Sequence, residues 1–373
     1  MTEEDEMTWL GLKKLAFVPV FRPDAHPPDL IPADWAGDIE RRVLFDPDPA
    51  TGFDRSLRAY IHTVSSGLAD LDAVVFPMVN VDQQDVPANV LEAQMGAQLR
   101  GEGFDAAAIV MLGGPGAGTS SGYWVRFVMA EGVGVWAMEF MHSLTGFGDL
   151  YPFGGNMGAF DEMACSCGTH PSAYTKAAIG WLAGSAVVQQ VGGPSNYRLH
   201  PVGLTQPPPS GRVTAVRVGV QVPYLMIEAR RHVDLFDRGT PSEGVIVYRV
   251  QTSDPLGHAQ NATAPVELLT PTALPVGGAY VANTGATVSV DSLISGGYSV
   301  TVADPASVLV EVPDLFETDA SDAAHILQAK GLVPKFSGPN TAHSWVAQQS
   351  PVAGTQVPKG TTVSMLLKTG PKP

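Results

Sequence analysis

The chain has 373 residues, of which 45% are apolar and 16% are charged, and its formal net charge is −15 at pH 7. This length fits about two or three domains, and the composition is that of a globular protein, not of a disordered chain. The acidic balance argues against a nucleic-acid partner, because phosphate binding needs basic patches. No apolar run approaches the ~18 residues of a membrane span, so we expect no transmembrane segment.

The N-terminus is acidic, with Glu3, Glu4, Asp5 and Glu6 among its first residues. A secretory signal peptide begins with basic residues and continues with an apolar run, so this segment does not match one. We expect a location outside the cell or in an exported particle, reached without a classical signal peptide or after loss of a leader. An intracellular location is the alternative.

Residues 1 to about 55 are rich in proline and are expected to be irregular, apart from a strand at 15–21. Residues 54–67 have apolar side chains at helical spacing, with Asp54 as the candidate N-cap. Further strands are predicted at 73–81, 104–112 and 123–129, and further helices at 86–99 and 133–144.

A glycine-rich stretch at 113–122 follows the predicted strand at 104–112. A phosphate-binding loop would continue with Gly-Lys-Ser/Thr and open a helix. Neither feature follows here, so we interpret the stretch as a flexible turn.

The run from Glu131 to Ala137 is apolar and has small residues, which favours a buried helix, and this helix continues through Met138, Glu139 and His142. Positions four apart lie on one face of a helix. The spacing is that of the HExxH motif, in which two histidines bind zinc and the glutamate activates a water molecule. Met138 stands where the first histidine is expected, and a neutral thioether is a poor zinc ligand.

Three stretches, in the right order, resemble the immune-inhibitor-A-like secreted zinc metallopeptidases. Residues 138–151, "MEFMHSLTGFGDLY", resemble the family's "HEFGHxLGLPDLY". Residues 160–182 resemble its Met-turn and the following helix, and residues 224–250 resemble its "IEaR…yD…lPseGvliY" segment. The resemblance runs from about Arg55 to about Val250 and implies a zincin-like fold.

The resemblance implies that Glu139 is the general base, that His142 is a zinc ligand and that Met163 is the Met-turn residue packed beneath the metal. The third ligand would be Asp149, which lies one residue further from His142 than the family's aspartate. With Met138 replacing a histidine, one imidazole and one shifted carboxylate fall short of the three protein ligands of a catalytic zinc site. We therefore expect a peptidase fold without activity and without a cofactor.

The alternative is an active zinc endopeptidase with an altered ligand set. Cys165 and Cys167 follow the Met-turn, and His142 would then bind zinc together with Cys165, Cys167 or His170. The simpler interpretation of the C-x-C pair is incidental packing. We do not expect a disulfide across a single residue, because it would be strained. Two cysteines also exclude a disulfide-stapled secreted scaffold.

After Trp181, short alternating runs separated by glycine- and proline-rich turns indicate an all-β region. The predicted strands lie at 187–191, 197–200, 213–220, 224–229 and 244–250, with more β runs at 266–302. Glu228 and Arg230 alternate on one strand face, where a structural ion pair is favoured over a catalytic carboxylate pair.

Residues 306–373 resemble a PASTA domain. The matching features include the start Val312-Pro313-Asp314-Leu315, a helix at 321–329 that stops at Gly331, and the turn residues Gly354 and Gly360. The resemblance implies a unit that senses the cell wall or muropeptides, or a spacer.

We therefore expect an α+β protein with a zincin-like metallopeptidase domain at 1–185, a β-sandwich-like domain at 186–305 and a small α+β PASTA domain at 306–373. The predicted role is structural or binding, at a cell wall or in an exported particle such as a phage virion or injection machine. The predicted partners are peptidoglycan or a protein assembly, without nucleic acid.

Overall fold

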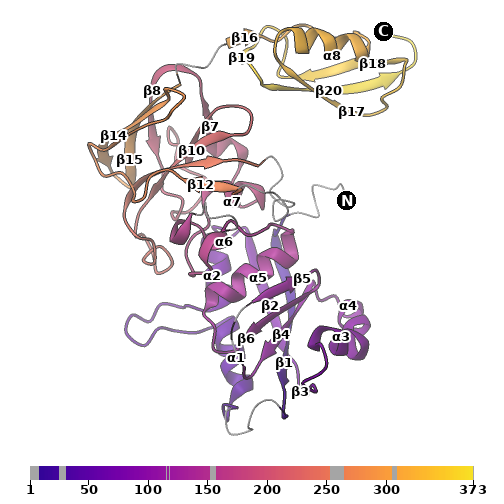
Figure 1. The fold of residues 1–373 in the computed structure, drawn as a ribbon, viewed down its shortest axis with the longest axis vertical. Helices are drawn as coiled ribbons and strands as arrows, with labels where there is room; N and C mark the ends of the chain where they lie inside the picture. The colour runs from indigo at the N-terminus through magenta and orange to yellow at the C-terminus, as the bar shows by residue number, and fades with distance from the viewer. Residues whose placement is uncertain are drawn as a thin grey trace.

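The computed structural model describes residues 8–24, 31–114, 116, 118–151, 157–252, 264–304 and 309–372. Over these ranges the helices and sheets follow one another in three regions along the chain (Figure 1). None of the described helices combines the length and apolarity that a membrane crossing requires.

The first region contains a mainly parallel sheet with the strand order β2-β1-β4-β6-β5. Strands β1, β2, β4 and β6 are parallel, whereas β5 is an antiparallel edge strand, and the short β3 pairs with β1. Parallel sheets are usually covered on both faces, which accounts for β4, whose six residues are all apolar and buried. The strands are β1 (Gly11–Phe21), β2 (Ala69–Val75), β3 (Val79–Asn80), β4 (Ala106–Met111), β5 (Thr119–Ser121) and β6 (Trp124–Val128).

Helices cover both faces of this sheet. One face packs against α1, α2 and α5, and the other packs against α3 and α4, which are joined by a π-helical turn. The helices are α1 (Trp35–Leu44), α2 (Leu57–Val64), α3 (Pro87–Leu91), the π turn (Glu92–Gly96), α4 (Ala97–Gly101) and α5 (Val133–Thr145).

Helix α5 is held in the core by aromatic contacts. Trp136 stacks on Phe127 of β6 with ring centroids 4.5 Å apart, and Phe140 lies 5.5 Å from Phe17 of β1. The helix ends at Gly146, whose φ of 69° is the left-handed C-terminal conformation that glycine adopts without strain. This fixed helix sets the position of Glu139 and His142.

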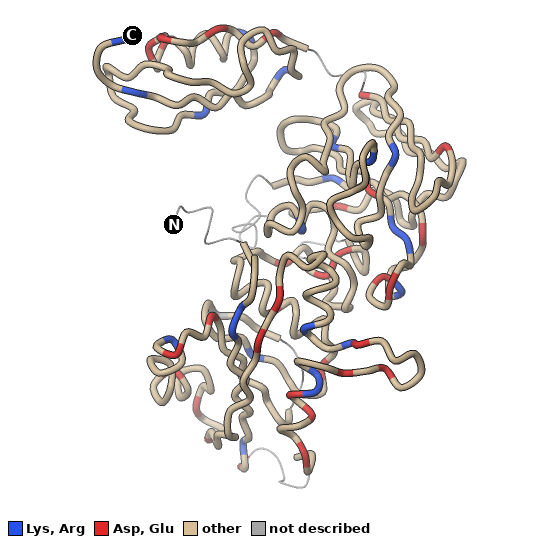
Figure 2. Tube along the Cα trace, turned by 180° about the vertical axis from the view of Figure 1, so that it is seen from behind, with Lys and Arg blue, Asp and Glu red and all other residues tan. Residues whose placement is uncertain are grey.

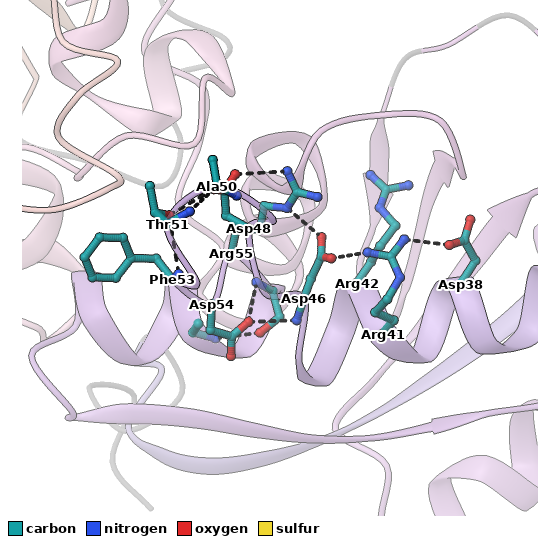
Figure 3. Close-up of polar contacts among 12 residues, drawn as sticks. Asp38, Arg41, Arg42, Asp46, Asp48, Ala50, Thr51, Phe53, Asp54 and Arg55 are labelled. Carbon is teal, nitrogen blue, oxygen red and sulfur yellow. Dashed lines mark hydrogen bonds and ion pairs between the residues drawn. The ribbon is translucent and has the colours of Figure 1, made fainter.

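Helix α1 is tied to the start of α5 by Arg42, which donates hydrogen bonds to the carbonyls of Met129 and Glu131. Its guanidinium also lies over the Trp136 ring, 4.5 Å from the centroid. Asp46, just after α1, accepts from Arg41 and from Arg55 Nε, the latter at 3.0 Å (Figure 3). The segment that contains α1 therefore has regular structure and fixed polar contacts, although its proline content predicts an irregular chain.

The second region has two antiparallel or mixed sheets, with the orders β12-β11-β10-β9-β7 and β13-β14-β15-β8. They pack face to face around a common apolar cluster, as in a sandwich. Four short helical segments precede them: the 3-10 turn Gly158–Phe160, α6 (Glu162–Cys165), α7 (Ala173–Ala178) and the 3-10 turn Gly184–Ala186. The strands are β7 (Val187–Gln190), β8 (Gly192–Leu199), β9 (Ala215–Val218), β10 (Tyr224–Arg230), β11 (Gly244–Val250), β12 (Val266–Leu268), β13 (Ala279–Val281), β14 (Thr287–Ile294) and β15 (Gly297–Asp304).

The β10–β11 sheet is buried on both faces. Ile227 and Val247 face the second sheet, whereas Met226, Ile246 and Tyr248 join the same core as α5. The boundary predicted at residue 185 therefore lies between the first sheet and the later sheets, but one apolar core extends across it. The boundary predicted at 305 and 306 lies outside the described residues.

The last region is a small α+β unit with its own apolar core. Helix α8 (Ala320–Ala329) ends where predicted, before Gly331 at φ 72°. In Figure 1 this unit lies at the opposite end of the molecule from β1. Its strands are β16 (Leu309–Glu311), β17 (Val333–Ser337), β18 (Ser344–Ser350), β19 (Gln356–Pro358) and β20 (Thr362–Thr369).

Several local predictions were wrong in detail. Helix α1 lies in the stretch predicted to be irregular, and the Asp34 side chain caps it by accepting from the Gly37 amide at 3.2 Å. Ser56, not Asp54, caps α2, because Asp54 accepts the amides of Asp46 and Ser56 instead. The glycine-rich stretch 113–122 is not only a turn, since its end pairs with β6 as strand β5.

Charged residues of both signs are interspersed along the chain (Figure 2). Along the trace drawn there, Lys and Arg alternate with Asp and Glu.

Candidate functional site

The predicted site lies at the C-terminal half of α5 and in the loop that follows it. His142 uses both ring nitrogens: Nδ1 lies 2.5 Å from the Phe147 carbonyl oxygen and Nε2 lies 2.9 Å from Asp149 Oδ1. The structure therefore places Asp149 next to His142, across a loop that is one residue longer than in the resembling family.

Two acceptors around one imidazole favour the protonated ring. Burial alone lowers the pKa of His142, but the hydrogen bond to Asp149, its charge and the Phe147 carbonyl outweigh burial and raise this pKa above the ordinary value. An imidazolium donates from both nitrogens and has no lone pair for a metal. When it is protonated, His142 forms an ion pair with Asp149.

Glu139 lies on the preceding turn of α5 and is buried, with 6% of its surface exposed. Burial raises the pKa of its carboxyl from 4.5 to about 7; the charge of His142 opposes the rise and that of Asp149 adds to it. Oε2 has no hydrogen-bond partner among the described residues. A Cβ added to Gly118 would lie 2.1 Å from Oε1, so the backbone before β5 covers the carboxyl closely.

Tyr151 borders the same loop and is about half exposed. Burial of the hydroxyl, followed by the charge of Asp149 and a hydrogen bond to it, raises the pKa of Tyr151 to about 12. The phenol is therefore neutral at physiological pH and can serve as a hydrogen-bond donor.

Met138 is 4% exposed and belongs to the main apolar core. Met163 is also fully buried in that core, and its carbonyl accepts a hydrogen bond of 2.8 Å from the Leu150 amide, next to Asp149. The Met163 amide donates to Asp161 Oδ1 at 2.9 Å, which holds the turn that starts α6. Met138 is therefore an apolar core residue at the position where the sequence resemblance predicts the first histidine.

The prediction that Cys165 and Cys167 would not form a disulfide was wrong. The structure joins them, because Ser166 adopts a left-handed conformation with φ 50° that turns the chain back on itself. The two Cα atoms are then 5.2 Å apart, within the usual range for a disulfide. In this oxidised form neither cysteine offers the thiolate that the alternative zinc site requires.

His170 does not approach the His142 site. Among the described residues, the group of His, Cys, Asp or Glu side chains that converges closely enough to hold a metal consists of His170, Asp234 and Asp237. Glu139, His142 and Asp149 do not form such a group within the described ranges. The altered ligand set of His142, Cys165, Cys167 and His170 is likewise not assembled there.

A buried polar layer joins the α6–α7 segment to the β10–β11 sheet, and its ion pair confirms the structural interpretation of Glu228 and Arg230. Arg230 Nη2 lies 2.8 Å from Glu228 Oε1, and both side chains are fully buried. Arg230 also donates to the His170 carbonyl at 3.1 Å and to the Phe160 carbonyl. Glu228 Oε2 accepts from Tyr248 Oη at 2.8 Å.

Lys176 of α7 belongs to this layer and was not predicted from the sequence. Its Nζ donates to the Val202 carbonyl at 2.7 Å and lies 3.2 Å from His170 Nδ1, and only 1% of the residue is exposed. Burial lowers the pKa of Lys176 to about 7, mainly because the ammonium loses water. The available signal in the sequence was a single lysine in the short, otherwise uncharged helix α7.

We expect the Glu139→Gln variant to be more stable than the unchanged chain at pH 8. A folded-state pKa of about 7, against an ordinary 4.5, means that stability falls as the pH rises between these values, because the folded state retains a proton that the unfolded state loses. This rise in the pKa of Glu139 corresponds to a loss of at most about 3 kcal/mol in the free energy of unfolding, which the glutamine variant would avoid. Urea unfolding at pH 4 and pH 8 measures the effect. The exposed Glu102→Gln variant is the control, and an advantage independent of pH would contradict the expectation.

Comparison with known proteins identifies one part of the chain. The PASTA domain family model matches residues 310–369, within the boundaries predicted from the sequence. A search of curated proteins finds no match to the chain. The described helices and strands of this segment and its separate apolar core are those of an independent unit. The chain therefore contains a C-terminal PASTA domain.

Proposed function

We propose that this chain is a peptidoglycan-binding protein whose N-terminal region has the architecture of a zinc metallopeptidase but does not cleave peptide bonds. PASTA domains bind peptidoglycan, and residues 310–369 supply that unit. The protein would act at a cell wall or on an exported particle such as a phage virion or injection machine, where peptidoglycan is accessible.

The proposal of a peptidase-like region is supported by the three sequence stretches that resemble immune-inhibitor-A-like metallopeptidases. Glu139 and His142 lie on one buried helix, and the following loop brings Asp149 within 2.9 Å of His142. The antiparallel edge strand β5 precedes this helix, and an exposed strand edge can pair with an extended peptide. A zinc peptidase would need such a glutamate, such ligand positions and such an edge strand for its substrate, together with a bound metal.

The observation that carries the loss of catalysis is Met138. It lies one helical turn before His142, and its buried thioether cannot replace the imidazole that zinc requires. In the structure His142 Nε2 faces Asp149 Oδ1 at 2.9 Å and Nδ1 faces the Phe147 carbonyl oxygen at 2.5 Å. Without a metal, no group polarises a scissile carbonyl or activates water.

The second candidate function is an active endopeptidase with another ligand set. The specific observation in its favour is Glu139, whose pKa near 7 suits a general base at neutral pH. This candidate requires a metal at His142, so it predicts bound zinc that is lost in the His142→Ala variant.

The wall-binding proposal predicts that the full chain sediments with purified peptidoglycan sacculi. A chain ending at residue 304 should stay in the supernatant, because it retains the first three apolar cores but lacks the PASTA core. Circular dichroism and thermal unfolding would show that the shortened chain is folded. Sedimentation of the shortened chain to the same extent as the full chain, or no sedimentation of the full chain beside a known wall-binding protein, would contradict the proposal.

A further inference from the structure

His170, Asp234 and Asp237 form a compact group away from His142. His170 lies in the segment between α6 and α7, and the two aspartates lie in the turn after β10. One donor atom of each residue lies within 4.8 Å of the others. His170 is fully buried and Asp237 is 1% exposed, so two of the three side chains are removed from solvent.

Asp237 has a charged neighbour, Lys176, whose pKa burial lowers and the Asp237 carboxylate raises, but it has no hydrogen-bond partner among the described residues. Both of its carboxylate oxygens are buried and have no hydrogen-bond partner among the described residues. The backbone of Gly203 covers one of them, since a Cβ added there would lie 1.8 Å from Oδ2. A buried carboxylate without hydrogen bonds is costly unless a cation compensates it.

Asp234 is already oriented as a ligand would be. Its Oδ1 accepts from the amides of Phe236 at 2.8 Å and Asp237 at 3.1 Å, which leaves Oδ2 facing His170 Nε2 at 2.9 Å. Lys176 contacts the other ring nitrogen, Nδ1, at 3.2 Å. The ammonium lies on the Nδ1 side of the ring and is also close enough to Asp237 for the charge of this carboxylate to raise the pKa of Lys176. The amides of Phe236 and Asp237 hold the Asp234 carboxylate in place.

A cavity of about 410 Å³ opens beside this group and provides an entry path. Asp234 and Gly203 line it, together with His62 and Thr63 of α2. Because Gly203 also contacts Asp237, the cavity wall and the buried carboxylate are adjacent. Water from the cavity could complete a coordination shell.

We propose that His170, Asp234 and Asp237 bind one divalent transition-metal ion of the Zn²⁺ or Mn²⁺ class, which links the α6–α7 segment to the turn after β10. One imidazole and two carboxylates suit such ions, and two negative charges match a dication. The three atoms need to move together by about an ångström to reach ligand distances. This site is independent of the proposed function, because it shares no residue with the His142 site.

The test uses the full chain stripped with EDTA and then incubated with ZnCl₂ or MnCl₂. We expect one metal equivalent per chain after desalting, measured by atomic emission, and a rise in melting temperature of roughly 5 °C at saturating metal. Asp237→Asn keeps the side-chain shape but should weaken binding at least tenfold and remove the rise. His142→Ala is the matched control and should retain both.

Metal-free Asp237→Asn should fold, because the carboxylate that it replaces makes no hydrogen bond to a described residue. If it does not fold, Asp234→Asn and the stoichiometry of the unchanged chain decide the question. Less than one equivalent in the unchanged chain, or a metal held equally well by the folded aspartate variants, would overturn the proposal. Loss of the metal in His142→Ala would assign it to the other site and would also overturn it.

Discussion

Replacement of Arg230 by methionine is expected to lower the free energy of unfolding by about 3–5 kcal/mol. The variant leaves Glu228 fully buried without its cation and removes the donors to the carbonyls of His170 and Phe160. Burial raises the pKa of Glu228 even with Arg230 present. Without Arg230 this pKa should rise further, so the loss should be smaller at acidic pH, where the carboxyl is protonated in both states.

Two further variants separate the ion pair from simple loss of packing. In Glu228→Gln/Arg230→Met, removal of both charges should recover part of the stability lost in the single variant. Arg249→Met on the neighbouring strand breaks a 2.8 Å pair with Glu267, but the side chains are 30% and 41% exposed. This control should cost less than about 1 kcal/mol. Urea unfolding in which Arg230→Met equals Arg249→Met would contradict the expectation.

Replacement of Met138 by histidine is expected to create a zinc site that the unchanged chain lacks. Residues 138 and 142 lie on the same face of α5, one turn apart. Structural zinc sites bind with about 10–16 kcal/mol over four ligands, so one added ligand contributes roughly 3 kcal/mol, or about 100-fold in affinity. Zinc also favours the neutral imidazole, which would release Asp149 from its ion pair with His142 to act as a third ligand.

Isothermal titration of zinc into the folded variant measures this gain. Met141→His is the matched control, because Met141 is equally buried on the same helix but is adjacent to His142 instead of one turn away. His142→Ala in the Met138→His background should remove the additional equivalent. A folded Met138→His chain that takes up no more zinc than the Met141→His chain would contradict the zinc-peptidase geometry proposed for α5.

The elements predicted best from the sequence are those with long local signals. Strand β4 is a continuous apolar run, helix α5 is mostly apolar and ends before a glycine, and α8 also ends before a glycine. Helix α1 was missed because prolines surround it, although Asp34 before Trp35 is an N-cap signal. Strand β5 was missed because three residues of a glycine-rich stretch pair only with a partner that folding supplies.

The candidate sites show the same division. Glu139, His142 and Asp149 lie within one motif, so their proximity follows from one helix and one loop. His170 and Asp234 are far apart in sequence, and their contact at 2.9 Å depends on how the α6–α7 segment packs on β10. The disulfide depended on the left-handed conformation of Ser166, which residue spacing does not reveal.

Cleavage of casein by the unchanged chain in the presence of zinc tests the central claim most directly. We expect any cleavage to equal that of the Glu139→Ala variant, and we expect His142→Ala to leave the amount of bound zinc unchanged. One zinc per chain that is lost in His142→Ala, together with cleavage that is abolished in Glu139→Ala, would contradict it.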